Sequence, residues 1–526
     1  MNRFILAICC VVAVSAPVIG EVWKESLASL IQAGNRKEAL ARIHAGADVN
    51  EAQPDGTRPI HWAIYKVDYE LLGALLTKKA KVNVTNDFGY TPIAEAAQLG
   101  DARLVKMLLD AGAEPEGANP DGQTALMLAI NTGELPVVEM LIKAGASVNR
   151  IEEFRNQTPL MWAATAPRNA GQMVKLLLSK GADVRPRALY TDWPNQITSE
   201  PRAQYRPVGG LTALLYAARD GCYDCVEALL GAGVDVNAPT PEGVTALMLA
   251  LDNQHNDVAK LLLDRGANPN VWDWWGRTAL YIVIDRREAA LAPARGSGAG
   301  RAASASDRSP VSSMEMINIL LAAGVDPDTQ LNMHRPSRGG NSGRFGDPLL
   351  STGCTPLLRA TMGNDMEAVQ VLLAKGASPN IDDMGMTAFL VAAGLGGGRG
   401  FGGQAGAGGV ANIALMDLLL QHGADVNARV TGTKTYSMRV ARAPSANEGM
   451  SALHVAAQAG RADLVRYLLD KGANAEIVDN NGHKPIDLVG ISPPPGRGGP
   501  AGGNSTTKAG NLAEIRELLR DSGSRK

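Results

Sequence analysis

The chain has 526 residues, of which 45% are hydrophobic and only 4% aromatic, and its formal net charge is −2. The apolar content is that of a globular chain, and the balance of charge gives no support to nucleic-acid binding. Because aromatic residues are scarce, alanine and leucine must supply the core, as close packing of helices prefers.

The first predicted element is a secretory leader over residues 1–20. Arg3 is followed by an apolar run that reaches Ile19, and polar sequence returns after Gly20. A basic start, a short apolar middle and small residues near a cut are typical of a signal peptide. We therefore expect cleavage after Gly20 and a periplasmic or secreted mature chain, residues 21–526. An uncleaved anchor helix is the alternative; no other stretch reaches the ~18 apolar residues that a membrane span needs.

After the leader, one short phrase recurs about every 33 residues, and a Leu-Leu pair and then Gly-Ala-x-x-Asn follow most copies. A period of this length indicates a repeat array. The copies are Thr91-Pro92-Ile93, Thr124-Ala125-Leu126, Thr158-Pro159-Leu160, Thr212-Ala213-Leu214, Thr245-Ala246-Leu247, Thr278-Ala279-Leu280, Thr355-Pro356-Leu357 and Ser451-Ala452-Leu453-His454.

The residues of one repeat predict a pair of helices. The Thr245 hydroxyl is placed to cap a short first helix, whose apolar face carries Leu247 and Leu251. A second helix begins at about Asp257, and Gly266 ends it in a left-handed conformation that glycine adopts at low cost. One such pair cannot bury both of its faces, so neighbouring repeats must stack on it.

These features resemble the ankyrin repeat over nearly the whole mature chain. About ten repeats are recognisable, with polar, degenerate ends at residues 24–56 and at Lys484–Leu488 with Asn511–Leu519. The resemblance implies an all-α solenoid of stacked helix-turn-helix units with outward β-hairpin-like turns. A leader ahead of such an array is similar to exported bacterial ankyrin-repeat proteins.

The resemblance also implies a non-catalytic, monomeric module or scaffold that binds a protein partner through its turn tips and short-helix face. Tip residues make partner contacts in the family, and exposed Trp and Arg dominate interface energies. The alternative is that long insertions fold back and bury the tryptophans. The matching positions are Trp272, Trp274, Trp275, Arg277, Phe88, Tyr90, Phe154, Arg155, Met384 and Met386.

Long insertions interrupt the array at residues 186–210, 286–313, 327–351, 394–411, 429–449 and 490–510. We expect loops there, with 286–313 separating the two helices of one repeat. That segment and 429–449 each carry an excess of three positive charges, Arg286 and Arg287 among them. Such loops indicate an acidic partner, such as an anionic cell-envelope polymer. The alternative is that their charges are solvated and bind no partner.

No pattern indicates a catalytic, cofactor or metal site. None of the seven histidines has a second ligand at a metal spacing, and His61 and His454 stand where structural hydrogen bonds are expected. Residues 398–403 match Gly-x-Gly-x-x-Gly but follow a helix, which favours a linker over a dinucleotide site. An accessory or protective subunit of an exported enzyme is the remaining alternative to a scaffold.

Three cysteines remain after the leader. Cys222 and Cys225 form Cys-x-x-Cys where a second helix begins, and Cys354 stands alone. Three interpretations stay open for the pair: packing in the core, a structural disulfide favoured by export, or redox or metal chemistry.

Overall fold

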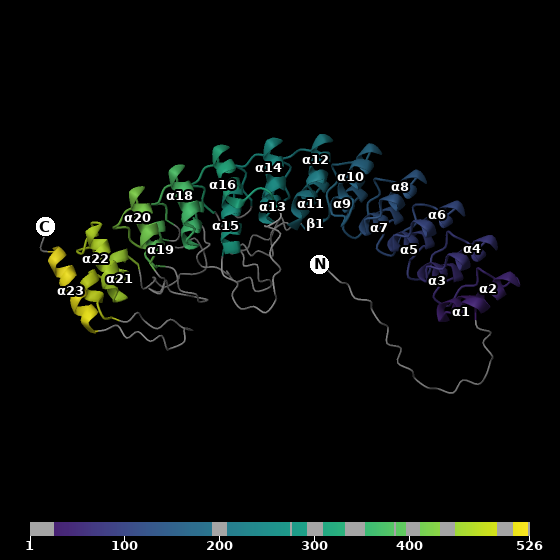
Figure 1. Ribbon diagram of the computed structural model, residues 1–526, viewed down its shortest axis with the longest axis horizontal. Coiled ribbons are helices and arrows are strands. Elements are labelled where there is room, and N and C mark those ends of the chain that lie inside the picture. Colours follow the sequence, from purple (N-terminus) through teal and green to yellow (C-terminus); the bar gives the residue numbers. More distant parts are fainter. Residues whose placement is uncertain are drawn as a thin grey trace, which may run out of the picture. The chain divides into compact units, whose positions relative to one another are not determined.

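The structure is a computed structural model. It describes residues 26–191, 208–273, 276–291, 309–331, 353–382, 385–395, 411–431, 448–491 and 509–523. The leader, residues 1–20, lies outside these ranges. By its contacts the chain divides into two compact units, Met1–Ala129 with Glu139–Ala146, and Ile130–Val138 with Ser147–Lys526. Each unit is built of successive helix pairs (Figure 1).

The first unit holds α1 (Leu27–Ala33), α2 (Arg36–His44), α3 (Pro59–Tyr65), α4 (Tyr69–Thr77), α5 (Pro92–Leu99) and α6 (Ala102–Asp110). α7 (Ala125–Thr132) and α8 (Leu135–Lys143) each contribute residues to both units. The second unit continues with α9 (Pro159–Ala164), α10 (Ala170–Ser179), β1 (Tyr190–Thr191), β2 (Val208–Gly209), α11 (Ala213–Asp220), α12 (Tyr223–Gly231), α13 (Ala246–Asp252), α14 (Asn256–Asp264), α15 (Ala279–Leu291) and α16 (Ser313–Ala322).

The same unit ends with α17 (Pro356–Met362), α18 (Met366–Ala374), α19 (Ala388–Ala392), α20 (Ile413–Gln421), α21 (Ala452–Gln458), α22 (Ala462–Asp470), the 3-10 turn η3 (Pro485–Leu488) and α23 (Ala509–Gly523). The helix pairs confirm the all-α fold. Over the ranges that the structure covers, no helix is long and apolar enough to cross a membrane.

Helices start and stop where the repeated phrase predicts. The Thr245 hydroxyl accepts the amide N–H of Met248 at 3.4 Å, which satisfies one of the unpaired donors of the first turn. Gly266 follows α14 with φ +88°, and its neighbour Ala267 donates back to the carbonyl of Leu262 at 2.9 Å. Only a residue without a Cβ adopts this left-handed stop cheaply.

The core runs between like helices of successive repeats. In the second unit α11 packs on α13, α13 on α15 and α15 on α17, while α12 packs on α14. Leu247 and Leu251 of α13 are 1% exposed, and Leu262 of α14 is fully buried. Burial of these small apolar faces against neighbouring repeats is what stabilises each pair.

The asparagine of the Gly-Ala-x-x-Asn phrase links neighbouring repeats. Asn237 accepts the amide N–H of Asn268 through Oδ1 at 2.7 Å and donates from Nδ2 to the carbonyl of Gly266 at 3.2 Å. In the first unit, Asn83 makes the same two bonds, to Glu114 and Gly112. The spacing of the phrase therefore places each asparagine where it can hydrogen-bond the next repeat. We call this series of bonds the asparagine ladder.

Regular structure lies inside the predicted insertions at 186–210 and 286–313. Residues 190–191 and 208–209 pair as antiparallel strands, with Tyr190 opposite Gly209, so the base of the 186–210 insertion is a hairpin. The predicted start of the loop at residue 286 is wrong, because α15 continues to Leu291. The next described residue is Ser309. Ion pairs of Arg286, Arg287 and Glu288 hold the start of this extension against neighbouring helices.

Candidate partner-binding surface

Several of the described turn tips are built on one buried side chain. Asp273 accepts the amide N–H of Arg277 through Oδ1 at 2.9 Å, and its own N–H donates to the carbonyl of Arg277 at 3.2 Å. The same five-residue arrangement closes the tips at Asn86, Asn119, Thr240 and Asp479. An anchor that pairs with the backbone across the turn gives its tip a fixed shape.

Aromatic side chains lie on or directly beside several of the tips, including the tip that Glu152 closes by accepting the N–H of Gln157 at 3.0 Å. In the first unit Phe88 is 60% exposed and Tyr90 is half-buried. In the second unit Phe154 is 68% and Trp272 is 62% exposed, and Arg155 is also exposed. No described part of the chain therefore covers Trp272. Large aromatics held exposed on a rigid tip are typical of contact surfaces.

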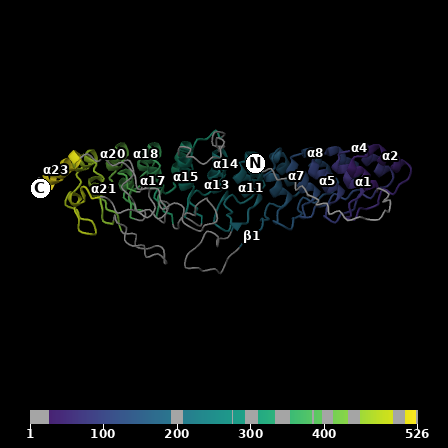
Figure 2. The same ribbon diagram turned by 90° about the horizontal axis from the view of Figure 1, so that it is seen from below.

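The hairpin of the 186–210 insertion adds further apolar surface beside Phe154. Its residue Leu189 donates its N–H to the carbonyl of Arg155 at 2.7 Å, so the hairpin lies against the neighbouring tip. Leu189 is 56% and Tyr190 is 49% exposed. Figure 2 shows β1 at the edge of the second unit opposite α14. Neither residue was among the sequence-predicted contact positions.

Each tip from the hairpin to Trp272 contacts the next one. The Arg187 guanidinium donates to the carbonyl of Pro239 at 2.8 Å, which joins the hairpin to the next tip. One tip further, the carbonyl oxygen of Trp272 lies 3.2 Å from where a Cβ on Gly243 would stand. We call the exposed set Phe154, Arg155, Leu189, Tyr190 and Trp272 the tip row.

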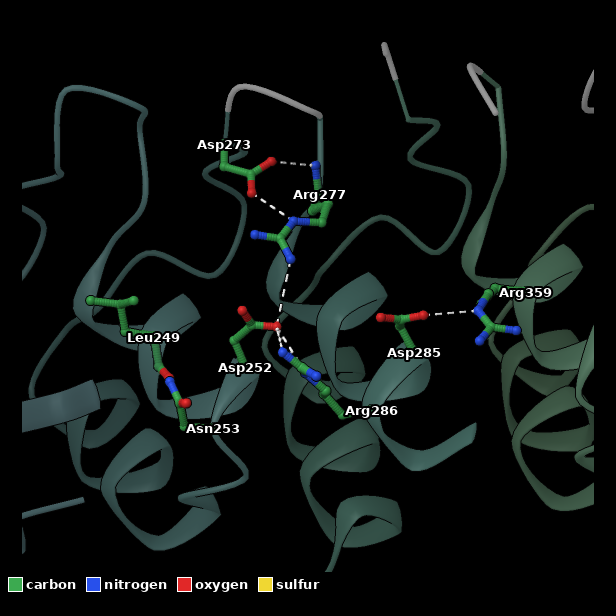
Figure 3. Close-up of polar contacts among 8 residues, drawn as sticks. All are labelled: Leu249, Asp252, Asn253, Asp273, Arg277, Asp285, Arg286 and Arg359. Atoms are coloured by element: carbon green, nitrogen blue, oxygen red, sulfur yellow. Dashed lines mark hydrogen bonds and ion pairs between the residues drawn. The ribbon is translucent and has the colours of Figure 1, made fainter. Parts of the chain in front are cut away.

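Arg277 does not belong to this surface. The sequence predicts a partner contact there, but the residue is only 9% exposed. Its Nε donates to Oδ2 of Asp273 at 2.7 Å, and Nη1 lies 3.5 Å from Oδ1 of Asp252 in α13 (Figure 3). The carboxylates turn the side chain inward, so the prediction of an exposed arginine is wrong.

The remaining predicted contact positions are less informative. Met386 is half-buried at the start of the repeat that holds α19. Trp274, Trp275 and Met384 lie outside the described residues.

The basic charge predicted for the 286–313 insertion is largely paired where it can be seen. Arg286 donates to Oδ1 of Asp252 at 2.8 Å through Nε (Figure 3). Arg287 lies 2.5 Å from Asp365 and 2.7 Å from Glu367 at the start of α18. These two arginines therefore stabilise the fold, and their charges are already paired with carboxylates of this chain.

A second ion cluster joins α15 to α17. Arg359 of α17 donates to Asp285 at 3.0 Å (Figure 3). It also donates to Oε2 of Glu288 at 2.8 Å. Burial raises the pKa of Glu288 to about 8, and its Oε1 has no hydrogen-bond partner among the described residues. A Cβ on Gly363 would overlap the Glu288 carboxyl, so the extension of α15 packs closely there.

The histidines predicted to be structural make the expected bonds. His61 accepts the N–H of Arg58 through Nδ1 at 3.1 Å. His454 accepts that of Ser451 at 3.1 Å, and its Nε2 lies 3.0 Å from the carbonyl oxygen of His483. Both close the first turn of a helix, and burial lowers the pKa of each ring. Among the described residues, no group of acidic, histidine and cysteine side chains forms a metal site.

The Cys-x-x-Cys pair is oxidised in the structure. Cys222 and Cys225 are joined as a disulfide, while Cys354 is buried and its Sγ donates to the carbonyl of Thr355 at 3.7 Å. Cys225 is fully buried as well, so the core-packing interpretation and the disulfide interpretation both describe part of what is seen.

Comparison with known proteins gives the same family along most of the chain. The family described as "Ankyrin repeats (3 copies)" matches residues 27–119, 96–188, 197–273 and 214–291. "Ankyrin repeats (many copies)" matches 419–489, and "Ankyrin repeat" matches 352–384. The chain belongs to the ankyrin-repeat family.

The individual proteins matched cover only part of this chain. The chain is 29% identical to alpha-latrocrustotoxin-Lt1a of Latrodectus tredecimguttatus over 136 residues, which are 26% of this chain and 8% of that protein. The crystal structure of the human ASB11 ankyrin repeat domain is similar with 24% identity and a TM-score of 0.37, over 46% of this chain and 98% of that one. Ankyrin repeats are protein–protein interaction modules, and that is the class of function the family gives.

Proposed function

We propose that this chain is a non-catalytic scaffold that binds a protein partner through the tip row. The observation that carries the proposal is the exposure of four large apolar side chains, Phe154, Leu189, Tyr190 and Trp272, on tips that contact one another in series. Side chains of this kind bury large area at a low cost in conformational entropy. The tips that hold them are braced by backbone and side-chain bonds, so little order has to be created on binding.

The proposal includes export from the cytoplasm as a soluble, monomeric chain. The leader-like composition of residues 1–20 supports it, and so does the Cys222–Cys225 disulfide, because disulfides persist in oxidising compartments. Mass spectrometry of the N-terminus of the native protein tests this part. Cleavage as proposed gives a first residue of Glu21, whereas an anchor helix leaves Arg3 and Ile19 in the protein.

Binding of an anionic polymer is the weaker candidate. Arg286 and Arg287 are paired with carboxylates, so the insertion at 286–313 offers less free positive charge than its composition suggests. The two candidates respond differently to salt. A polymer held by charge is released as ionic strength rises, whereas an apolar protein interface largely survives.

Site-specific photo-crosslinking tests the contact surface. A photoreactive phenylalanine analogue is placed at Phe154, Tyr190 or Trp272, one at a time, in the native host. Tyr223 serves as the control, because it is an aromatic residue, 42% exposed, on α12 and away from the tips. We expect one protein adduct common to the three tip positions and none at Tyr223. Adducts at Tyr223 alone would overturn the proposal.

A further inference from the structure

The start of α12 carries a disulfide whose two sulfurs differ in access. Cys222 is the N-cap of α12 and Cys225 its third residue. Cys222 is half-buried, whereas Cys225 is fully buried. A thiolate that approaches from solvent therefore meets Sγ of Cys222 and is kept from Cys225.

The position of Cys222 holds a carboxylate in sister repeats. Asp68, Asp101 and Asp365 are the N-caps of α4, α6 and α18, and each accepts an N–H of its helix within 3.2 Å. Cys222 has the same role, because the amide of Cys225 donates to its Sγ at 3.3 Å. Unpaired N–H groups at a helix start favour negative charge, and a thiolate formed there on reduction gains the stabilisation that the carboxylates have.

A histidine of the next repeat lies against the same turn. His255 is the N-cap of α14, the position that corresponds to Cys222 one repeat further on. A Cβ on Gly221 would overlap its ring, so the imidazole packs on the residue that precedes Cys222. Gly221 also has φ +76°, so both the backbone and the space favour glycine there.

We propose that Cys222–Cys225 is a redox-active disulfide that exchanges with dithiols, with Cys222 as the sulfur attacked. One thiolate of the dithiol bonds to Sγ of Cys222, the bond to Cys225 breaks, and Cys225 leaves as a thiolate that takes up a proton. The second thiolate of the dithiol then attacks the sulfur bonded to Cys222 and expels Cys222 as a thiolate. The dithiol loses two electrons and becomes a disulfide, and the cysteine pair gains them.

Thiol mapping of the mature, full chain tests this inference. The oxidised protein is incubated with dithiothreitol, quenched with iodoacetamide at a series of pH values, and each cysteine is mapped by mass spectrometry. We expect reduction of the pair while circular dichroism shows an intact array. Cys222 should be alkylated at least about tenfold faster than Cys225 and Cys354, with a midpoint below the ~8.5 of a free cysteine. A pair that resists dithiothreitol until the array unfolds, or a Cys222 midpoint at or above ~8.5, overturns the proposal.

Two variants assign the attacked sulfur. In Cys225→Ser the remaining Cys222 should form a mixed disulfide with oxidised dithiothreitol or glutathione. In Cys222→Ser the buried Cys225 should form none while the helical content stays that of the parent. Equal mixed-disulfide formation in the two variants contradicts the assignment. The tip row takes no part in these measurements, so their outcome is independent of the partner-binding proposal.

Discussion

Nε of Arg277 lies 2.7 Å from Oδ2 of Asp273, inside a single turn tip. The same guanidinium reaches Asp252 of α13 at 3.5 Å, so it ties the tip that carries Trp272 to the helix below (Figure 3). Two residues of this tip therefore have different roles. The exposed Trp272 is available for a partner, and the buried Arg277 holds the turn in shape.

Replacement of Arg277 should lower the free energy of unfolding without removing a residue of the tip row. The Asp273 side chain is fully buried, so Arg277→Ala leaves a buried carboxylate without its main partner. Breaking a buried pair on one side costs about 3–5 kcal/mol. Arg265→Ala is the matched control, because Arg265 is 42% exposed and 3.7 Å from Glu227, and it should change stability by less than ~1 kcal/mol. Urea denaturation compares the two, and equal midpoints would contradict this role of Arg277.

The asparagine ladder predicts a difference between two asparagines near the same helix pair. Asn237→Ala removes two hydrogen bonds between repeats and should destabilise the array by about 1–2 kcal/mol. Asn253→Ala removes one bond, to the carbonyl of Leu249 within its own helix end (Figure 3), and should have a smaller effect. Hydrogen exchange of the α13–α14 repeat measures both. Faster exchange in Asn253→Ala than in Asn237→Ala would count against the ladder.

Two glycine-to-alanine substitutions should change the stability of the chain in opposite directions. Gly363→Ala places a methyl group on the Glu288 carboxyl, which is buried and held by Arg359, so we expect destabilisation by about 1–3 kcal/mol. Gly231 ends α12 with nothing within 4 Å of an added Cβ. Gly231→Ala should therefore stabilise by about 0.5–1 kcal/mol, through lower entropy of the unfolded chain. Thermal denaturation gives the order, and a Gly363→Ala protein that melts above the parent would refute the close packing.

Glu95 predicts a pH dependence of stability. Burial raises its pKa from 4.5 to about 8, and its Oε2 has no hydrogen-bond partner among the described residues. Between these values the native chain keeps a proton that the unfolded chain has lost. The free energy of unfolding therefore falls as pH rises from 4.5 to about 8, by on the order of 1 kcal/mol per pH unit at most.

Replacement by glutamine isolates that contribution. Glu95→Gln keeps the shape and removes the ionisable group, so its stability should vary less over the same interval and exceed that of the parent at pH 9. Urea denaturation at pH 5, 7 and 9 measures the difference. An unchanged slope in the variant would show that Glu95 is not the group responsible.

The parts of the fold that could be predicted are those set by chemistry within one repeat. The Thr245 cap, the Gly266 stop and the burial of Leu247 depend on residues a few positions apart, and the phrase repeats them often enough to be recognised. The helical extension of α15 could not be predicted in this way. It depends on Arg359 and Asp365, more than 70 residues further along the chain.

The candidate surface was predicted in part for the same reason. Phe154 and Trp272 stand at tip positions that the repeat period identifies, and both are exposed. Arg277 shares that period, but its direction is decided by carboxylates on two different elements. Tyr190 becomes a tip residue only because it pairs with Gly209 across the insertion, a register that the alternation of residues does not reveal.

The affinity of the crosslinked partner for single variants tests the central claim most directly. Once the partner is identified, its dissociation constant is measured by calorimetry for the parent, Trp272→Ala and Tyr223→Ala, with circular dichroism as the check on folding. Trp272→Ala should bind about 30-fold more weakly, the loss of a contact worth about 2 kcal/mol, and Tyr223→Ala should bind as the parent does. Undiminished affinity of a folded Trp272→Ala protein, together with a loss in Tyr223→Ala, would contradict binding through the tip row.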